Sequence, residues 1–136
     1  MVHKPMMSEV EAARRLDWQN RVYEMHLNGK QSTSINFAGR KILVSRDVFA
    51  PVPFDHNLLA KSVLKEVKET DRVLDMGTGS GVQAILAASK STSVTAVDVN
   101  PFAVKLSERN VKLNKLCSQV KASKAICLGM FMESLT

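Results

Sequence analysis

A glycine-rich loop between a short apolar strand and a helix constrains the fold of this chain more than any other feature. The run Arg72–Met76 reads as a buried strand, and the alanine-rich run Val82–Ser89 reads as a helix. Between them stand Gly77, Gly79 and Gly81, which let the backbone turn sharply and lie close to a ligand. The helix that follows offers unpaired N–H groups and the positive end of its dipole. This order predicts a site for an anionic or nucleotide-like ligand.

The alternation of strand and helix patterns continues after this helix. Val94–Asp98 is a second predicted strand, and Pro101 at a first-turn position opens a helix that runs to about Asn114. Alternating strands and helices give a parallel sheet with right-handed crossovers, and its ligands gather at the carboxyl ends of the strands. The expected fold class is therefore α/β, with a Rossmann-like parallel sheet.

The residues before this unit predict a helix and a hairpin. Ser8 caps an amphipathic helix that extends to about Leu27, and residues 30–34 form a polar linker. Two β-prone runs, at 35–37 and 41–45, flank a glycine turn and predict a hairpin. We therefore expect two parts: residues 1–34 as an N-terminal helix and linker, and residues 35–136 as the binding domain.

Two prolines shape the connection from the hairpin to the sheet. Pro51 and Pro53 predict an extended segment over residues 48–54. Asp55 can cap a second helix that follows this segment.

Composition narrows the setting of the chain. It has 136 residues, is 45% hydrophobic and carries a formal charge of +6, but no apolar run approaches the roughly 20 residues of a bilayer span. No apolar signal segment follows Met1, so the expected location is the cytoplasm. Cys117 and Cys127 are expected to be ordinary reduced thiols, and no metal site is predicted.

Asp98 supplies the second element of the site. It is the last residue of the second predicted strand, where a carboxylate can accept hydrogen bonds from both hydroxyls of a ribose. A dinucleotide fingerprint G-x-G-x-x-G starting at Gly77 would need Gly or Ala at position 82, where Val82 stands. The spacing present is G-x-G-x-G, so a nucleoside ligand other than a dinucleotide is favoured.

This glycine spacing, with an acidic strand residue before it, resembles motif I of class I S-adenosylmethionine-dependent methyltransferases. Over about positions 40 to 120 the chain is similar to their small-domain group, which includes release-factor glutamine N-methyltransferases and the N-methyltransferases of ribosomal and transfer RNA. The segments that carry the resemblance are Val48-Phe49-Ala50-Pro51, Phe54-Asp55, Leu58-Leu59, Arg72-Val73-Leu74-Asp75-Met76-Gly77-Thr78-Gly79-Ser80-Gly81, Ala96-Val97-Asp98-Val99-Asn100-Pro101, Glu108-Arg109-Asn110 and Leu113-Asn114.

The resemblance implies S-adenosylmethionine as the cofactor and assigns contacts by position. The residues that it places at the cofactor are, for the methionine part, Asp75, Gly77, Thr78, Gly79 and Gly81, for the ribose, Asp98, and for the adenine, Val99 and Asn100.

The catalytic tetrapeptide of that group, Asn/Asp-Pro-Pro-Tyr/Phe, is absent from this sequence, whose four prolines are at positions 5, 51, 53 and 101. The tail over residues 129–135 only faintly resembles the segment that ends the group's third strand. The resemblance therefore implies the cofactor-binding half of an N-methyltransferase for protein glutamine or an RNA base, with no residue assigned as catalyst.

Two other functions remain open from the residues alone. One is a non-catalytic fragment that binds cofactor or a partner and self-associates through an open sheet edge. The other is a nicotinamide or adenine-nucleotide binder. The residues leave open whether the chain is itself an enzyme.

Several of these residues also have a structural interpretation. Asp75 can serve only the loop, Asp98 can cap the next helix, and Asn100-Pro101-Phe102 reads as a cap and turn rather than a catalytic loop. One basic set reads as a solvated surface, with nucleic-acid contact as the alternative. Its members are Lys105, Arg109, Lys112, Lys115, Lys121 and Lys124.

Overall fold

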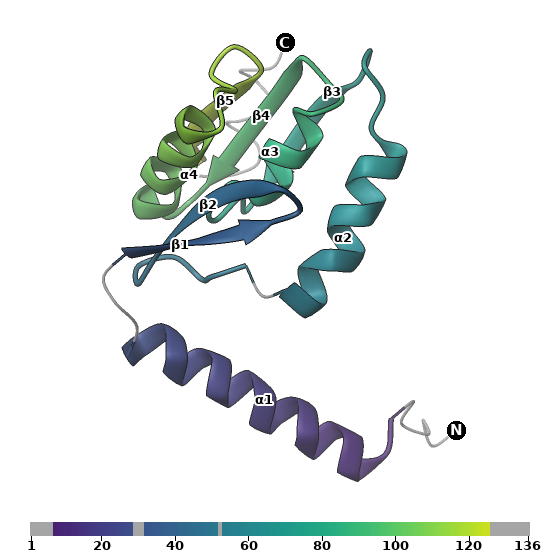
Figure 1. Cartoon of the computed structure of the whole chain (residues 1–136), viewed down its shortest axis with the longest axis vertical. Helices are drawn as coiled ribbons and strands as arrows, with labels where there is room; N and C mark the ends of the chain where they lie inside the picture. The colour runs from purple at the N-terminus through teal and green to yellow at the C-terminus, as the bar shows by residue number, and fades with distance from the viewer. Residues whose placement is uncertain (1–6, 29–31, 52, 126–136) are drawn as a thin grey trace.

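The structure is a computed structural model that describes residues 7–28, 32–51 and 53–125 (Figure 1). Its helices and strands are, in chain order, α1 (Glu9–Asn28), β1 (Ser32–Phe37), β2 (Arg40–Ser45), α2 (Pro53–Glu66), β3 (Arg72–Met76), α3 (Val82–Ala87), β4 (Ser93–Asp98), α4 (Pro101–Leu113) and β5 (Val120–Lys124).

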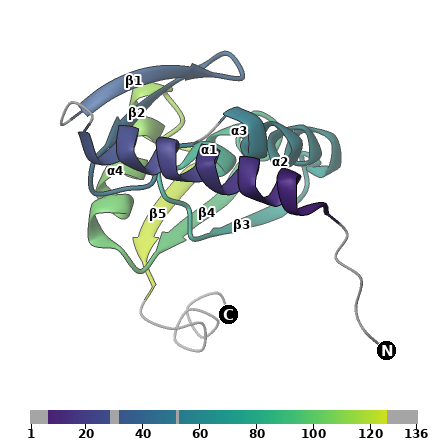
Figure 2. The ribbon, with the colours of Figure 1, turned by 90° about the horizontal axis from the view of Figure 1, so that it is seen from below.

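The centre of the fold is a parallel three-stranded sheet of order β3-β4-β5. Val73 pairs with Val94, and Val94 pairs with Val120, so the three parallel strands lie side by side and their carboxyl ends meet at the same end of the sheet. Helices α3 and α4 connect successive parallel strands and lie on one side of this sheet, as crossovers of one hand require, and α2, which precedes β3, lies on the same side (Figure 2). The predicted α/β class with a Rossmann-like parallel sheet is confirmed.

The core lies between the sheet and these helices. Every residue of the short helix α3 except half-buried Gln83 is buried, with Ala84 and Ile85 at 0% exposure, and the helix packs against Val94 and Ala96 of β4. The opposite face of the sheet has no helix over it among the described residues, and Leu74 and the other outward side chains of β3 are exposed. The sheet is therefore covered on one side.

The hairpin confirms the prediction from its turn. Ala38 and Gly39 both have positive φ, 48° and 76°, the combination that a tight two-residue turn between antiparallel strands requires. Strand β1 begins at Ser32, however, so the predicted linker over residues 30–34 is wrong for its last three residues. Ser32 pairs with Ser45 and Ser34 with Leu43, because pairing with β2 outweighs the weak strand preference of serine.

Two helix boundaries also differ from the predictions. The segment expected to be extended over residues 48–54 already turns helical at Pro53, where α2 begins. Proline is accepted there because the first turn of a helix leaves its N–H groups unpaired. Helix α3 ends at Ala87 instead of Ser89, since the Ser89 and Lys90 N–H groups bond the carbonyls three residues back, at Leu86 and Ala87.

The predicted N-terminal helix is present as α1, and Ser8 Oγ accepts the Glu11 N–H at 3.2 Å as its cap. Val10 and Leu16 are 65% and 60% exposed, so no other element of the described residues covers these apolar side chains of α1. Over the described ranges, no helix has the length and apolar character needed to cross a bilayer. The tail at 129–135 and Cys127 lie outside the described residues.

Candidate functional site

The glycine loop crosses the carboxyl ends of two neighbouring strands. The N–H groups of Gly77 and Thr78 both donate to the Val97 carbonyl of β4, at 2.9 and 3.0 Å. The loop that leaves β3 is thereby fixed over the end of β4, directly beside Asp98. The structure thus brings together the two elements that the sequence predicted.

The glycines of the loop face different surroundings. Gly77 has φ +72°, and a side chain added there would meet nothing within 4 Å, so the backbone is open toward solvent. Gly81 has φ +85°, and an added Cβ would lie 2.7 Å from Ser107 Oγ and 3.2 Å from Ser107 Cα. Gly77 leaves room for a ligand, whereas Gly81 lets the loop pack directly on α4.

The Asp75 side chain links β3 to the glycine loop and to α3 by hydrogen bonds. Its Oδ2 accepts the Thr78 hydroxyl at 2.6 Å and the Ala84 N–H at 3.1 Å. Burial raises the pKa of this carboxyl, the two hydrogen bonds act against that increase, and nearby Asp98 adds to it. The structural interpretation of Asp75 therefore has direct support, while its contact with a cofactor stays a prediction.

Asp98 connects the two loops at the sheet edge. One oxygen accepts the Gly79 N–H and the other accepts the Asn100 N–H, each at 2.9 Å. Each carboxylate oxygen has two acceptor sites, so Asp98 keeps one site on each for a ligand such as a ribose diol. The alternative role as cap of α4 is not what the structure shows.

That cap is Asn100. Its Oδ1 accepts the Phe102 N–H at 3.0 Å, and its Nδ2 donates to the Asp47 carbonyl at 2.9 Å. The interpretation of Asn100-Pro101-Phe102 as cap and turn is confirmed. The side chain of Asn100 is thus engaged, and the predicted proximity of Asn100 and Val99 to an adenine stays a prediction.

These residues fit an S-adenosyl cofactor in chemistry and in shape. The loop offers open space over Gly77, while a Cβ added at Gly79 would be in ordinary van der Waals contact with Val48 Cγ1, at 3.8 Å. Asp98 offers acceptors for hydroxyls, and Val99 next to it is 68% exposed, which leaves an apolar surface for a base. A polar diol and a flat apolar ring are the two features of adenosine that this edge can bind.

Sequence reasoning missed one residue that shapes this site. Asn110 of α4 is fully buried and bonds both the glycine loop and the hairpin. The signal available was the segment Glu108-Arg109-Asn110, which carries part of the resemblance to the small-domain methyltransferases, but helical periodicity alone does not show which groups the Asn110 amide bonds.

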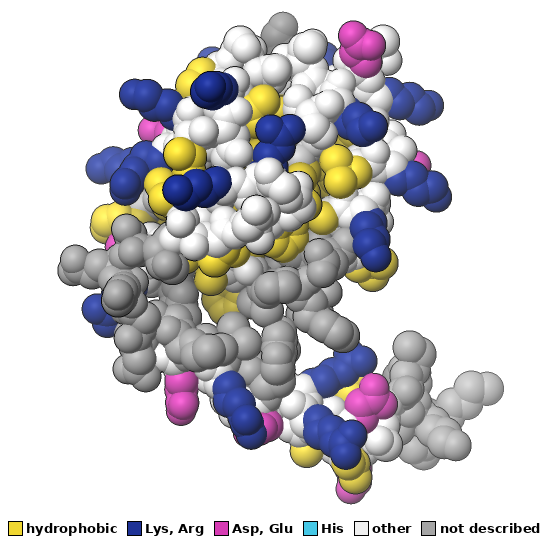
Figure 3. All heavy atoms as spheres, viewed as in Figure 1, with side chains coloured by type: hydrophobic (Ala, Val, Ile, Leu, Met, Phe, Trp, Pro, Cys, Tyr) yellow, Lys and Arg dark blue, Asp and Glu magenta, His cyan; other side chains and the backbone are white. Residues whose placement is uncertain are grey.

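The basic set lies on the surface, as predicted. All six of its members are exposed, and among the described residues none forms an ion pair. Figure 3 shows Lys and Arg side chains spread over the visible face, with few acidic ones among them.

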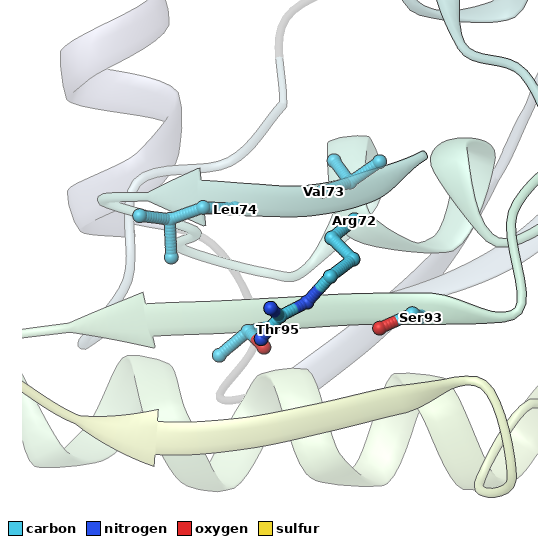
Figure 4. A pocket seen from close by; sticks show the side chains of 5 residues that line it. All are labelled: Arg72, Val73, Leu74, Ser93 and Thr95. Atoms are coloured by element: carbon cyan, nitrogen blue, oxygen red, sulfur yellow. The ribbon is translucent and has the colours of Figure 1, made fainter. Parts of the chain in front are cut away.

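A hollow of about 140 Å³ lies elsewhere, on the helix-free face of the sheet (Figure 4). It is lined by Arg72, Val73, Leu74, Ser93 and Thr95, and the Arg72 side chain extends over β4 toward Thr95. These residues belong to the first halves of their strands, away from the glycine loop, so the hollow is separate from the candidate site.

Similarity to known proteins decides the family. The family model of the ribosomal protein L11 methyltransferase (PrmA) matches residues 57–130, which is more than half of the chain. The chain belongs to this family. The predicted membership in the class I S-adenosylmethionine-dependent methyltransferases is thereby confirmed. The family also identifies S-adenosylmethionine as the cofactor, as the resemblance implied.

Individual relatives of this PrmA-family chain act on different substrates. The tRNA (guanine(37)-N(1))-methyltransferase Trm5b of Pyrococcus abyssi is 34% identical over 118 residues, 85% of this chain and 36% of the relative. A candidate protein N5-glutamine methyltransferase of Methanocaldococcus jannaschii is 39% identical over 83 residues, 60% of this chain and 41% of the relative. This chain therefore spans well under half the length of either relative.

A solved structure gives the same relationship. Trm5 of Methanocaldococcus jannaschii in complex with adenosine superposes with a TM-score of 0.64 and 25% identity. The match covers 72% of this chain and 31% of that protein. The fold of the described residues is thus that of a part of a larger methyltransferase.

Proposed function

We propose that this chain is the cofactor-binding half of an N-methyltransferase that acts on a protein glutamine or on an RNA base. The observation that carries the proposal is the hydrogen bond from the Gly79 N–H to Asp98, which joins the glycine loop to the carboxyl end of β4 in a chain of this family. The tRNA methyltransferase relative supports the RNA class, and the candidate glutamine methyltransferase relative supports the protein class. We place the boundary between the helical N-terminus and the binding domain near residue 34, and the chain in the cytoplasm.

The residues of this chain would hold and orient the cofactor. We assign the methionine part to Asp75, Gly77, Thr78, Gly79 and Gly81 of the loop. When bound, S-adenosylmethionine supplies an activated methyl group.

The ribose and adenine contacts fall at the end of β4. We assign the ribose to Asp98 and the adenine to Val99 and Asn100. The chain's contribution is alignment, because direct attack by a nitrogen on an activated methyl depends mostly on positioning and desolvation of the reactants.

The first prediction concerns ligand choice and Asp98. The chain should bind S-adenosylhomocysteine in preference to NAD, because Val82 stands where a dinucleotide loop needs a small residue. Asp98→Ala should weaken that binding by about 10- to 150-fold, since a hydrogen bond to a charged group contributes about 1.5–3 kcal/mol. Isothermal titration calorimetry with both ligands measures the two effects.

Glu108→Ala is the matched control for this titration. It also removes one negative charge, from the exposed side of α4, and should leave the affinity unchanged. Tighter binding of NAD would overturn the cofactor assignment, and an unchanged affinity in Asp98→Ala would return Asp98 to a role within the loops.

We also propose that the chain self-associates by pairing β3 with β3 of a second copy. Strand β3 is a sheet edge whose outward side chains Leu74 and Met76 are 37% and 51% exposed. The other edge, β5, carries exposed Lys121 and Lys124, residues that discourage edge pairing. A two-fold axis at Leu74 would set Arg72 opposite Met76 of the second copy, so like charges would not meet.

Sedimentation velocity over a range of protein concentrations tests this pairing. The unmodified chain should shift from monomer to dimer as concentration rises, and Leu74→Lys should remain a monomer. Ser123→Lys adds the same charge on the same face but at the β5 edge, and should still dimerise. A monomer at all concentrations, or a dimer lost equally in both variants, would refute the β3 edge as the interface.

A further inference from the structure

Asn110 joins three parts of the molecule through one side chain. Its Oδ1 accepts the Leu43 N–H of β2 at 2.7 Å, and its Nδ2 donates to the Leu43 carbonyl at 2.9 Å and to the Ser80 carbonyl at 2.8 Å. The residue is 0% exposed, so every hydrogen bond of its amide is made inside the protein. An amide has two N–H donors, and both are used here.

The partner on the hairpin side is the free edge of β2. Among the described residues, β1 is the only strand that pairs with β2, so alternate N–H and carbonyl groups of β2 face away from its partner strand. The Asn110 amide forms hydrogen bonds with both the N–H and the carbonyl of Leu43, as the backbone of a neighbouring strand would. Asn114, one helical turn later, donates to the Lys41 carbonyl at 2.9 Å, so the two amides follow the same strand edge.

The partner on the other side is the glycine loop itself. Ser80 lies between Gly79, whose N–H is held by Asp98, and Gly81, which packs on Ser107. The bond from Asn110 draws the Ser80 carbonyl toward α4.

We propose that Asn110 is a positioning residue for the cofactor, which sets the glycine loop and couples it to the hairpin. The inference rests on the proposed binding of the cofactor at this loop. Because linkage is reciprocal, a cofactor that orders the loop must also strengthen the bonds of Asn110 to Leu43. The position of the hairpin thereby depends on whether cofactor is bound.

Two variants on the same face of α4 test the proposal. Asn110→Ala and Asn114→Ala each remove an amide that bonds β2, and both should lower the melting temperature. Only Asn110 reaches the loop, so Asn110→Ala should weaken S-adenosylhomocysteine binding at least about tenfold, while Asn114→Ala should stay within about twofold of the unmodified chain. Equal affinities in the two variants would refute the proposal.

Hydrogen exchange on the unmodified chain keeps the test independent of whether Asn110→Ala folds. Adding S-adenosylhomocysteine should slow exchange of the Leu43 amide, which donates to Asn110, more than exchange of amides near the turn at Gly39. Unchanged protection of Leu43 at saturating ligand would overturn the coupling. Failure of the unmodified chain to bind S-adenosylhomocysteine at all would instead refute the proposed cofactor site.

Discussion

Gly81→Ala is expected to lower the free energy of unfolding by about 2–5 kcal/mol. The backbone of Gly81 lies at φ +85°, which costs a residue with a side chain about 1–2 kcal/mol. The new methyl group would stand 2.7 Å from Ser107 Oγ and 3.2 Å from its Cα and Cβ, and such overpacking adds about 1–3 kcal/mol. Urea unfolding followed by circular dichroism measures the change.

Gly39→Ala separates the two causes. Gly39 has a similar φ of +76°, but a side chain there would meet nothing within 4 Å, so only the backbone cost applies. Gly81→Ala combined with Ser107→Gly should recover part of the loss, because the Oγ and Cβ contacts are removed. Equal destabilisation by Gly39→Ala and Gly81→Ala would show that packing against α4 contributes nothing.

The parts of the fold that local chemistry determines could be predicted from the sequence. The turn at Ala38 and Gly39 and the cap at Asn100 depend on neighbouring residues, and both are present. The placement of Asp98 beside the loop follows from two parallel strands that end at one edge. The turn and the cap are each determined by residues within one short segment. The placement of Asp98 follows from the general geometry of parallel sheets.

The parts that depend on distant partners could not be predicted. Ser32 becomes a strand residue because Ser45 pairs with it, and the identity of Asn110 as a buried link depends on Leu43, which is far away in sequence. Tertiary hydrogen bonds decide these cases, and no local pattern reports them.

The second large effect is expected in catalysis by the 136-residue chain alone. The carboxyl ends of β3 and β4 can align a cofactor, but the sequence holds no Asn/Asp-Pro-Pro-Tyr/Phe segment to align the attacking nitrogen. Positioning of reactants contributes about 7–11 kcal/mol, so the methyl-transfer rate should be at least about five orders of magnitude below that of a complete enzyme. Transfer of labelled methyl from S-adenosylmethionine to tRNA, ribosomal protein L11 and a release factor measures it.

The same samples should bind S-adenosylhomocysteine in the titration, which separates an inactive site from an unfolded protein. Binding without transfer is the expected combination, because the residues that we propose to hold the cofactor and those that would hold the nitrogen belong to different strand ends. Multiple turnovers on any of the three substrates by a monomer would contradict the expectation. Residues outside the carboxyl ends of β3 and β4 would then have to align the attacking nitrogen, and the exposed side chains of α1 would be the first candidates.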